Sequence, residues 1–93
     1  MTLQKSLHVI KNFILKRYRN NLAGLIIFGS ANTGHFMSGK SDIDAIIIVK
    51  NLKKLDVEYE KEFLTDSLKQ YKFRIQYFHT LESIKKYVHE HVS

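Results

Sequence analysis

Residues 34 to 49 read GHFMSGKSDIDAIIIV, and this stretch supports two interpretations that exclude each other. Its first half, Gly34 to Ser41, fits the phosphate-loop pattern G-x-x-x-x-G-K-[ST] letter for letter. Its second half places Asp42 and Asp44 at the start of a long apolar run. The stretch is therefore either a loop that holds phosphate through backbone N–H groups, or the start of a strand that presents two carboxylates.

The surrounding sequence argues against the phosphate loop. Such a loop needs a strand that runs directly into its first glycine and a helix that begins at its Lys-Ser pair. Here the preceding apolar run ends at Phe28, and five residues separate Phe28 from Gly34. Residues 43–49 are apolar and mostly β-branched, which predicts a strand covered on both faces and not a helix. We therefore interpret the match to the loop pattern as a coincidence.

Asp42 and Asp44 suit the strand interpretation. Residues two apart on a strand point to the same face, so the two carboxylates are expected to project side by side. Adjacent carboxylates repel each other unless a cation lies between them. All-oxygen sites of this kind favour Mg²⁺ or Mn²⁺, and Mg²⁺ usually shares its coordination shell with substrate phosphates. An isolated Asp-x-Asp pair, however, more often only caps a loop.

A second feature favours a functional role for the pair. The apolar run Leu25 to Phe28 ends at Gly29-Ser30. A strand that runs into Gly-Ser lets the backbone and the serine hydroxyl approach a phosphate closely. Gly29 and Ser30 are therefore the candidate nucleotide-binding residues. Two neighbouring strands would then present a phosphate contact and a carboxylate pair at the same edge of one sheet.

The rest of the chain predicts an α/β (α+β) domain over residues 1–93. The expected order is α-β-β-α-β-α, with a small mixed sheet of about three or four strands flanked by helices. Helices are predicted over residues 3–18, over residues 56–71 and after Thr80, which is a good N-cap. Strands are predicted over residues 25–28, 43–49 and 73–78, with Asn20, Asn21 and Gly24 interrupting the pattern before the first of them.

Composition limits the classes of function. The 93 residues carry a net charge of +6, which favours anionic partners: nucleotides, nucleic acid or an acidic protein. Nucleic acid ranks last, because the chain lacks the aromatic and basic pattern of single-strand binders. The absence of cysteine excludes disulfides and thiolate zinc sites. The lack of a leader-like or membrane-spanning segment predicts a cytoplasmic protein with no membrane partner. The small core makes a homo-oligomer or a stable partner plausible.

Residues 26–49, IIFGSANTGHFMSGKSDIDAIIIV, resemble the core of the minimal nucleotidyltransferases in the DNA polymerase β superfamily. The shared pattern is an apolar strand, Gly-Ser, about a dozen residues, Ser-Asp-x-Asp and a second apolar strand. The flanking helices and the strand near residue 75 agree with the family in order and length. The resemblance implies the palm-like nucleotidyltransferase fold of that superfamily.

The resemblance also implies roles for individual residues. Asp42 and Asp44 would be the catalytic residues and the ligands of Mg²⁺ (or Mn²⁺), while Gly29 and Ser30 would hold the β- and γ-phosphates of an NTP, with ATP as the expected substrate. A hydroxyl would attack the α-phosphorus, and pyrophosphate would leave. The protein would thus transfer a nucleoside monophosphate to a hydroxyl acceptor.

The chain departs from the family at the position of a third carboxylate. Family members usually supply a third carboxylate from the next strand, which here reads KFRIQYFH over residues 72–79 and contains no acid. Gln76 is the best candidate for that position, and Ile75 or Tyr77 would take it if the alignment shifted by one. Glutamine is neutral, so it is a weaker metal ligand and cannot act as a base. The alternative function is therefore an impaired member that binds NTP or a partner without turnover.

The resemblance implies a partner as well. Minimal members of the family commonly pair with a small helical HEPN protein as a toxin–antitoxin couple, in which the transferase-like chain is the antitoxin. In some couples it adenylylates its partner. The expected acceptor is therefore a hydroxyl on a HEPN-type protein.

Overall fold

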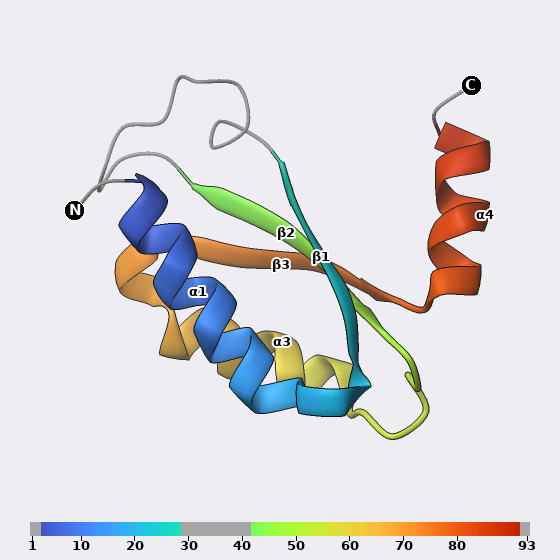
Figure 1. Ribbon diagram of the computed structural model, residues 1–93, viewed down its shortest axis with the longest axis horizontal. Coiled ribbons are helices and arrows are strands. Elements are labelled where there is room, and N and C mark those ends of the chain that lie inside the picture. Colours follow the sequence, from blue (N-terminus) through green and yellow to red (C-terminus); the bar gives the residue numbers. More distant parts are fainter. Residues whose placement is uncertain (1–2, 29–41, 92–93) are drawn as a thin grey trace.

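The computed structural model describes residues 3–28 and 42–91, and its elements follow the predicted order (Figure 1). The helices are α1 (Leu3–Tyr18), α3 (Val57–Ser67) and α4 (Leu81–His91). The strands are β1 (Leu22–Phe28), β2 (Ile43–Val49) and β3 (Phe73–His79). Short 3₁₀ turns, η1 (Arg19–Asn21) and η2 (Lys69–Tyr71), follow α1 and α3.

The three strands form one mixed sheet in the order β1-β2-β3. β1 pairs with β2 in the antiparallel direction, and β3 pairs with β2 in the parallel direction. The parallel pair is connected by α3, as a parallel connection requires a crossover. The predicted fold class, with residues 43–49 as the central strand, is confirmed.

Alternate residues of β2 enter two different cores. α1 and α3 lie together on one side of the sheet (Figure 1), and the odd-numbered residues of β2 are buried there. The even-numbered Ile46 and Ile48 are buried on the opposite face with Ile84 of α4. The main core consists of Ile10, Ile14, Tyr18, Ile43, Ala45, Ile47, Val49, Leu64, Leu68, Phe73, Ile75 and Phe78. A strand that is covered on both faces needs a continuous apolar sequence, and this is what β2 has.

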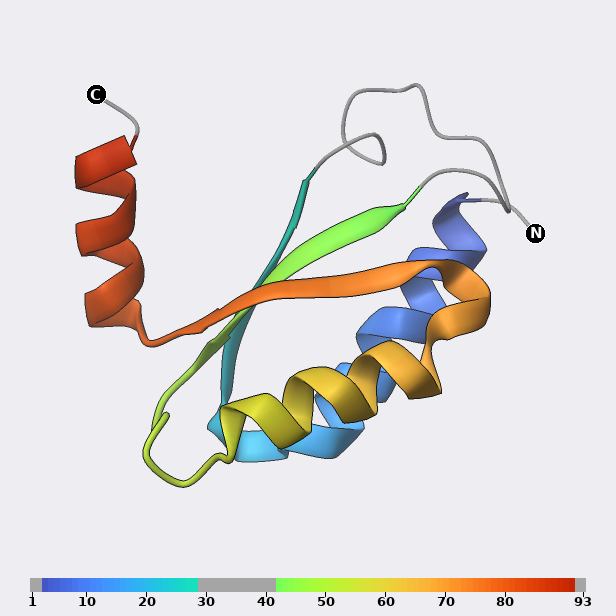
Figure 2. The same cartoon turned by 180° about the vertical axis from the view of Figure 1, so that it is seen from behind.

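α4 begins at the predicted cap. The Thr80 hydroxyl accepts a hydrogen bond from the Ser83 backbone N–H at 3.1 Å, and the Ser83 hydroxyl accepts one from the Thr80 backbone N–H at 2.8 Å. These bonds satisfy N–H groups that the first turn of a helix leaves without a partner. From the end of β3, α4 projects away from α1 and α3 (Figure 2). None of the described helices has both the length and the apolar character that crossing a membrane requires.

β1 is longer than predicted. It begins at Leu22, and Gly24, which was expected to interrupt the pattern, lies inside the strand. The pairing with β2 shifts register between Leu22 and Gly24. A glycine is tolerated at such an irregularity because it has no side chain to misplace, so it bends the strand without ending it.

α3 is shorter than predicted at both ends. Asp56 is not helical but caps the helix, and its carboxylate accepts a hydrogen bond from the Tyr59 backbone N–H at 3.2 Å. The α-helix ends at Ser67, and η2 follows. Lys72 then adopts a left-handed conformation with φ of 53°. This reversal is needed because the chain must turn back at once to enter β3 parallel to β2.

One polar cluster at the edge of the main core was missed by the sequence analysis. The Arg17 guanidinium donates through Nε and Nη2 to the two carboxylate oxygens of Glu60, each at 2.9 Å, and the Tyr18 hydroxyl donates to Glu60 at 2.8 Å. Hydrogen bonding from Arg17 lowers the pKa of Glu60 below its ordinary value. Burial, together with the bond to Glu60, raises the pKa of Tyr18. The cluster ties the end of α1 to the first turns of α3.

We expect Glu60→Gln to lower the free energy of unfolding by about 1–2 kcal/mol at pH 7, because it removes the charge that pairs with a partly exposed Arg17. Since the folded-state pKa of Glu60 is lowered, its contribution is present above the ordinary glutamate pKa of about 4.3 and is lost as the pH falls through the folded value. The variant should therefore lose less stability than the wild type as the pH falls below about 4.3.

Urea unfolding at several pH values measures both effects. Glu62→Gln, an exposed change on the same helix, is the matched control and should leave stability within about 0.5 kcal/mol of the wild type. Equal acid sensitivity of the Glu60 variant and the wild type would contradict the assignment.

Candidate functional site

Asp42 and Asp44 lie where the sheet begins its parallel pairing. Asp42 precedes β2, and Asp44 is the second residue of the strand. Between them Ile43 is fully buried towards α1 and α3, so strand alternation directs the two carboxylates to the opposite face. The Ile43 backbone N–H donates to the Lys72 carbonyl at 3.0 Å, which holds this end of β2 against the start of β3.

A single guanidinium contacts both carboxylates. Arg74 Nη2 lies 3.2 Å from Asp42 Oδ2, and Arg74 Nε lies 3.1 Å from Asp44 Oδ1. The two acids therefore lie on one face of the strand, as predicted, and both contact one guanidinium. Their environments differ, because the Asp42 side chain is 45% exposed whereas that of Asp44 is only 16% exposed.

Gln76 lies beside the pair. Its side-chain Nε2 donates to Asp44 Oδ1 at 3.2 Å, so this oxygen accepts from both Arg74 and Gln76. The pairing of β2 with β3 shifts register here: Ala45 pairs with Ile75, and the next residue of β2 pairs with Tyr77. Gln76 is the extra residue, and irregularities of this kind re-aim side chains near sites.

The other two positions considered for the third carboxylate do not approach the pair in this way. Ile75 is 8% exposed and belongs to the main core. Tyr77 is half-exposed, and its ring contacts those of His79 and Tyr87, with centroids 5.8 and 6.0 Å away. Of the three, Gln76 is therefore the residue next to Asp44, and it is neutral.

The side chains of Asp42, Asp44 and Gln76 would suit one divalent ion better than two. The carboxylate oxygens of Asp42 and Asp44 are hard donors of the kind that Mg²⁺ prefers, and Gln76 contributes an amide N–H beside them. Within residues 3–28 and 42–91, no group of three or more His, Cys, Asp or Glu side chains could hold a metal. Two charged ligands suit an ion that completes its shell with phosphate oxygens and water. An ion here would bind the same two carboxylates that Arg74 contacts.

The predicted phosphate-binding residues, Gly29 and Ser30, fall outside the described residues. The last described residue of β1 is Phe28, and it pairs directly with Asp44. The strand that leads into Gly29-Ser30 therefore ends opposite the carboxylate pair. The described residues also exclude the phosphate-loop interpretation of residues 34–41, because β2 and not a helix follows.

Arg74 is a residue of the candidate site that the sequence analysis did not identify. The sequence pattern contained part of this information, since alternation along β3 places Arg74 and Gln76 on the same face of the strand. That pattern could not show which acids they would meet, because the partners lie 30 and 32 residues away in the sequence.

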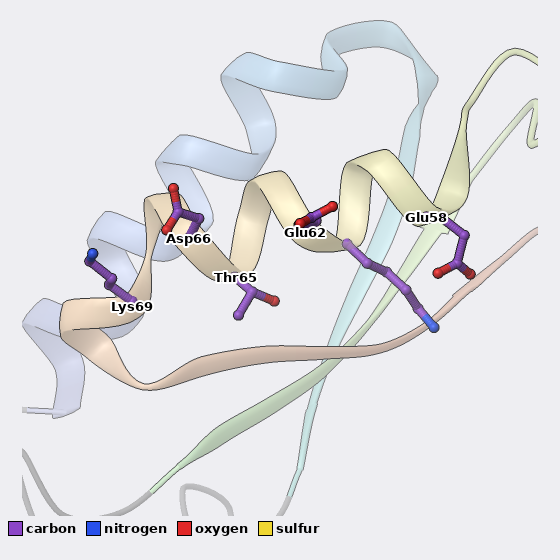
Figure 3. Close-up of a pocket in the computed structure, with 6 residues that line it drawn as sticks. Glu58, Glu62, Thr65, Asp66 and Lys69 are labelled. Carbon is purple, nitrogen blue, oxygen red and sulfur yellow. The ribbon is translucent and has the colours of Figure 1, made fainter.

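A depression of about 560 Å³ lies elsewhere, on the outer side of α3. The labelled side chains in Figure 3 are spread along the outer surface of α3 and the start of η2. They mix both charges and do not include Asp42, Asp44 or Gln76; the lining consists of Glu58, Lys61, Glu62, Thr65, Asp66 and Lys69. We therefore do not consider this depression a candidate site.

Comparisons with known proteins identify the family and the fold. The family described as "Nucleotidyltransferase domain" matches residues 7–92, and because this is nearly the whole chain, the protein belongs to that family. A presumed nucleotidyltransferase from Sulfolobus solfataricus has a similar structure, with a TM-score of 0.61 and 20% identity over 88% of this chain and 70% of that chain. At this identity the similarity establishes a shared fold. No curated protein matches the sequence.

We expect Gln76→Glu to tighten Mn²⁺ binding roughly tenfold, because a third carboxylate would replace a hydrogen-bond donor to Asp44 and increase the need for a cation. Titration calorimetry with Mn²⁺ measures the change. The matched control is Gln70→Glu, the same substitution at an exposed position in η2. Equal affinities for the two variants would show that Gln76 does not occupy the third ligand position.

Proposed function

We propose that this member of the nucleotidyltransferase family binds an NTP, with ATP as the expected substrate, together with Mg²⁺, and transfers the nucleoside monophosphate to a hydroxyl acceptor. The observation that carries the proposal is the convergence of Asp42 and Asp44 on one cation, Arg74, at 3.2 and 3.1 Å. Two carboxylates held this closely need positive charge between them, and a divalent ion with a bound triphosphate can supply it.

Different residues would bind the metal ion and the phosphates. Asp42 and Asp44 would hold Mg²⁺ (or Mn²⁺), and the bound ion would stabilise negative charge on the phosphate oxygens. Gly29 and Ser30 would bind the β- and γ-phosphates through backbone N–H groups and the serine hydroxyl. The pairing of Phe28 with Asp44 supports this division, because β1 ends beside the carboxylates immediately before Gly29-Ser30.

The reaction is a substitution at the α-phosphorus. A bond forms between the acceptor oxygen and the α-phosphorus, the bond to the bridging oxygen breaks, and pyrophosphate leaves with that electron pair. The acceptor hydroxyl gives its proton to solvent, since Gln76 cannot accept it. Such reactions depend mainly on positioning and electrostatic stabilisation, so a site without a carboxylate base can still be active.

The proposed acceptor is a hydroxyl on a small helical partner of the HEPN type, which would make this chain the antitoxin half of a pair. The resemblance described above is the basis of this proposal. The surface of α4 is consistent with it, because Leu81 and Val88 are 56% and 44% exposed on a helix that projects from the sheet. A homo-oligomer would be an alternative use of the same surface.

A second candidate function is favoured by Gln76. A neutral amide stands beside Asp44 where the family usually has a carboxylate, and Arg74 already neutralises part of the charge of the pair. A member built in this way could bind NTP–Mg²⁺, or a partner, without turnover.

We expect the double variant Asp42→Asn/Asp44→Asn to abolish Mg²⁺-dependent ATP binding, because it removes both charged ligands. Titration with a fluorescent ATP analogue, with and without Mg²⁺, measures the loss. The control is Glu62→Gln/Asp66→Asn, which makes the same change in net charge on exposed positions of α3. Unchanged ATP affinity in the first variant would contradict the metal-binding role of the pair.

Label transfer separates the two candidate functions. With ATP labelled at the α-phosphate, Mg²⁺ and a HEPN-type partner, a transferase should label the partner, whereas ATP labelled at the γ-phosphate should not. No transfer with intact ATP binding would support the binding function instead. Label on the partner from γ-labelled ATP would contradict nucleotidyl transfer, because that phosphate leaves with pyrophosphate.

A further inference from the structure

We propose that Arg74 is a positioning residue that takes the place of the divalent ion when no nucleotide is bound. It holds Asp42 and Asp44 together and competes with free Mg²⁺ for their oxygens, so that the metal enters together with the triphosphate. The inference rests on the proposed function in one respect, that the carboxylate pair binds a divalent cation. It adds a residue and an order of binding that the proposed function does not contain.

The contact depends on the shape of the guanidinium. Two different nitrogens of Arg74 are used, Nη2 for Asp42 and Nε for Asp44, at 3.2 and 3.1 Å. A planar group with several N–H donors can bridge two carboxylates in a defined orientation, whereas the single ammonium of lysine cannot reproduce this geometry. Arg74 therefore both neutralises the pair and fixes the direction of the two side chains.

The backbone keeps Arg74 in place while its side chain can leave. Arg74 is the β3 partner of Asp44, and the preceding residue, Phe73, is buried at 1% exposure. The guanidinium side chain itself is 54% exposed. Because none of the core packing depends on it, the side chain can move from the carboxylates into solvent, or onto a ligand, without disturbing the sheet.

Charge then sets the order of binding. A divalent ion at the pair would displace a cation from the same oxygens and would leave that cation a few ångströms away, where the two repel. Free Mg²⁺ therefore gains little. An NTP carries several negative charges and offers arginine new partners, since guanidinium groups pair well with phosphates. The triphosphate thus compensates for the displacement of Arg74, which the ion alone cannot do.

Ion pairs with substantial exposure contribute little to stability, so replacing Arg74 should leave the protein folded. It should also remove the guanidinium that contacts both carboxylates. We expect Arg74→Met to bind Mn²⁺ about tenfold more tightly than the wild type in the absence of nucleotide. Titration calorimetry, or the electron spin resonance signal of free Mn²⁺, measures the affinity directly.

Two further variants separate bridging from net charge. Lys50→Met removes one positive charge beyond the other end of β2 and should leave Mn²⁺ affinity unchanged. Arg74→Lys keeps the positive charge but lacks the planar guanidinium that contacts both carboxylates. Its Mn²⁺ affinity should lie between those of the wild type and Arg74→Met. An affinity of Arg74→Lys equal to that of the wild type would overturn the bridging role.

The wild-type protein gives an independent test by NMR. The Arg74 Nε–H resonance should be little changed by millimolar Mg²⁺ alone and should shift when Mg²⁺ and ATP are added together. A shift with Mg²⁺ alone as large as that with Mg²⁺ and ATP would overturn the proposed order of binding.

The inference and the proposed function can fail separately. If Arg74→Met binds Mn²⁺ no more tightly than the wild type, or if neither binds it, the role of Arg74 is overturned even where ATP binding requires Asp42 and Asp44. If the Arg74 variants behave as expected but the double aspartate variant still binds ATP with Mg²⁺, the proposed function is at fault instead.

Discussion

The parallel pairing of β2 with β3 is the constraint on which the rest of the structure depends. It sets Asp44 opposite Arg74, and the bond from the Ile43 N–H to the Lys72 carbonyl holds that end of the pair in register. A slip of one residue would turn Arg74 into the core and Phe73 out of it. Burial of the alternate side chains of β3 therefore also positions the charged groups of the site.

β2 serves both the core and the site because its two faces are covered to different extents. Its odd-numbered residues are buried by α1 and α3 along the whole strand. On the other face, α4 covers Ile46 and Ile48 but not the start of the strand. Asp44 therefore lies at the boundary, partly shielded but still open to a ligand. A carboxylate in this position interacts more strongly with cations than a fully exposed one does.

The charge balance of the candidate site differs from the one that the resemblance implies. Two carboxylates, one neutral amide and one guanidinium replace the three carboxylates that the resemblance implies. The guanidinium of Arg74 cancels part of the negative charge that would attract a metal, and Gln76 adds a hydrogen-bond donor where a ligand would be expected. Under the proposed function, such a site would suit a metal that arrives with its own anionic ligand, since a triphosphate would restore the missing negative charge.

Short-range patterns in the sequence determined the order of the helices and strands and the central position of residues 43–49. They also determined the common face of Asp42 and Asp44 and the helix cap at Thr80. Each of these follows from the spacing of neighbouring residues. The end of α3 at Ser67 and the continuation of β1 through Gly24 did not follow, because tertiary packing overrode local propensity there.

Only the tertiary structure decided which charges meet. Glu60 appears in the sequence as one acid among several on an amphipathic helix, yet it is buried against Arg17 and Tyr18. Arg74 appears as an ordinary basic residue of a strand, yet it joins both aspartates. Such pairings depend on strand register and helix packing between segments at least 30 residues apart, and no local spacing encodes them.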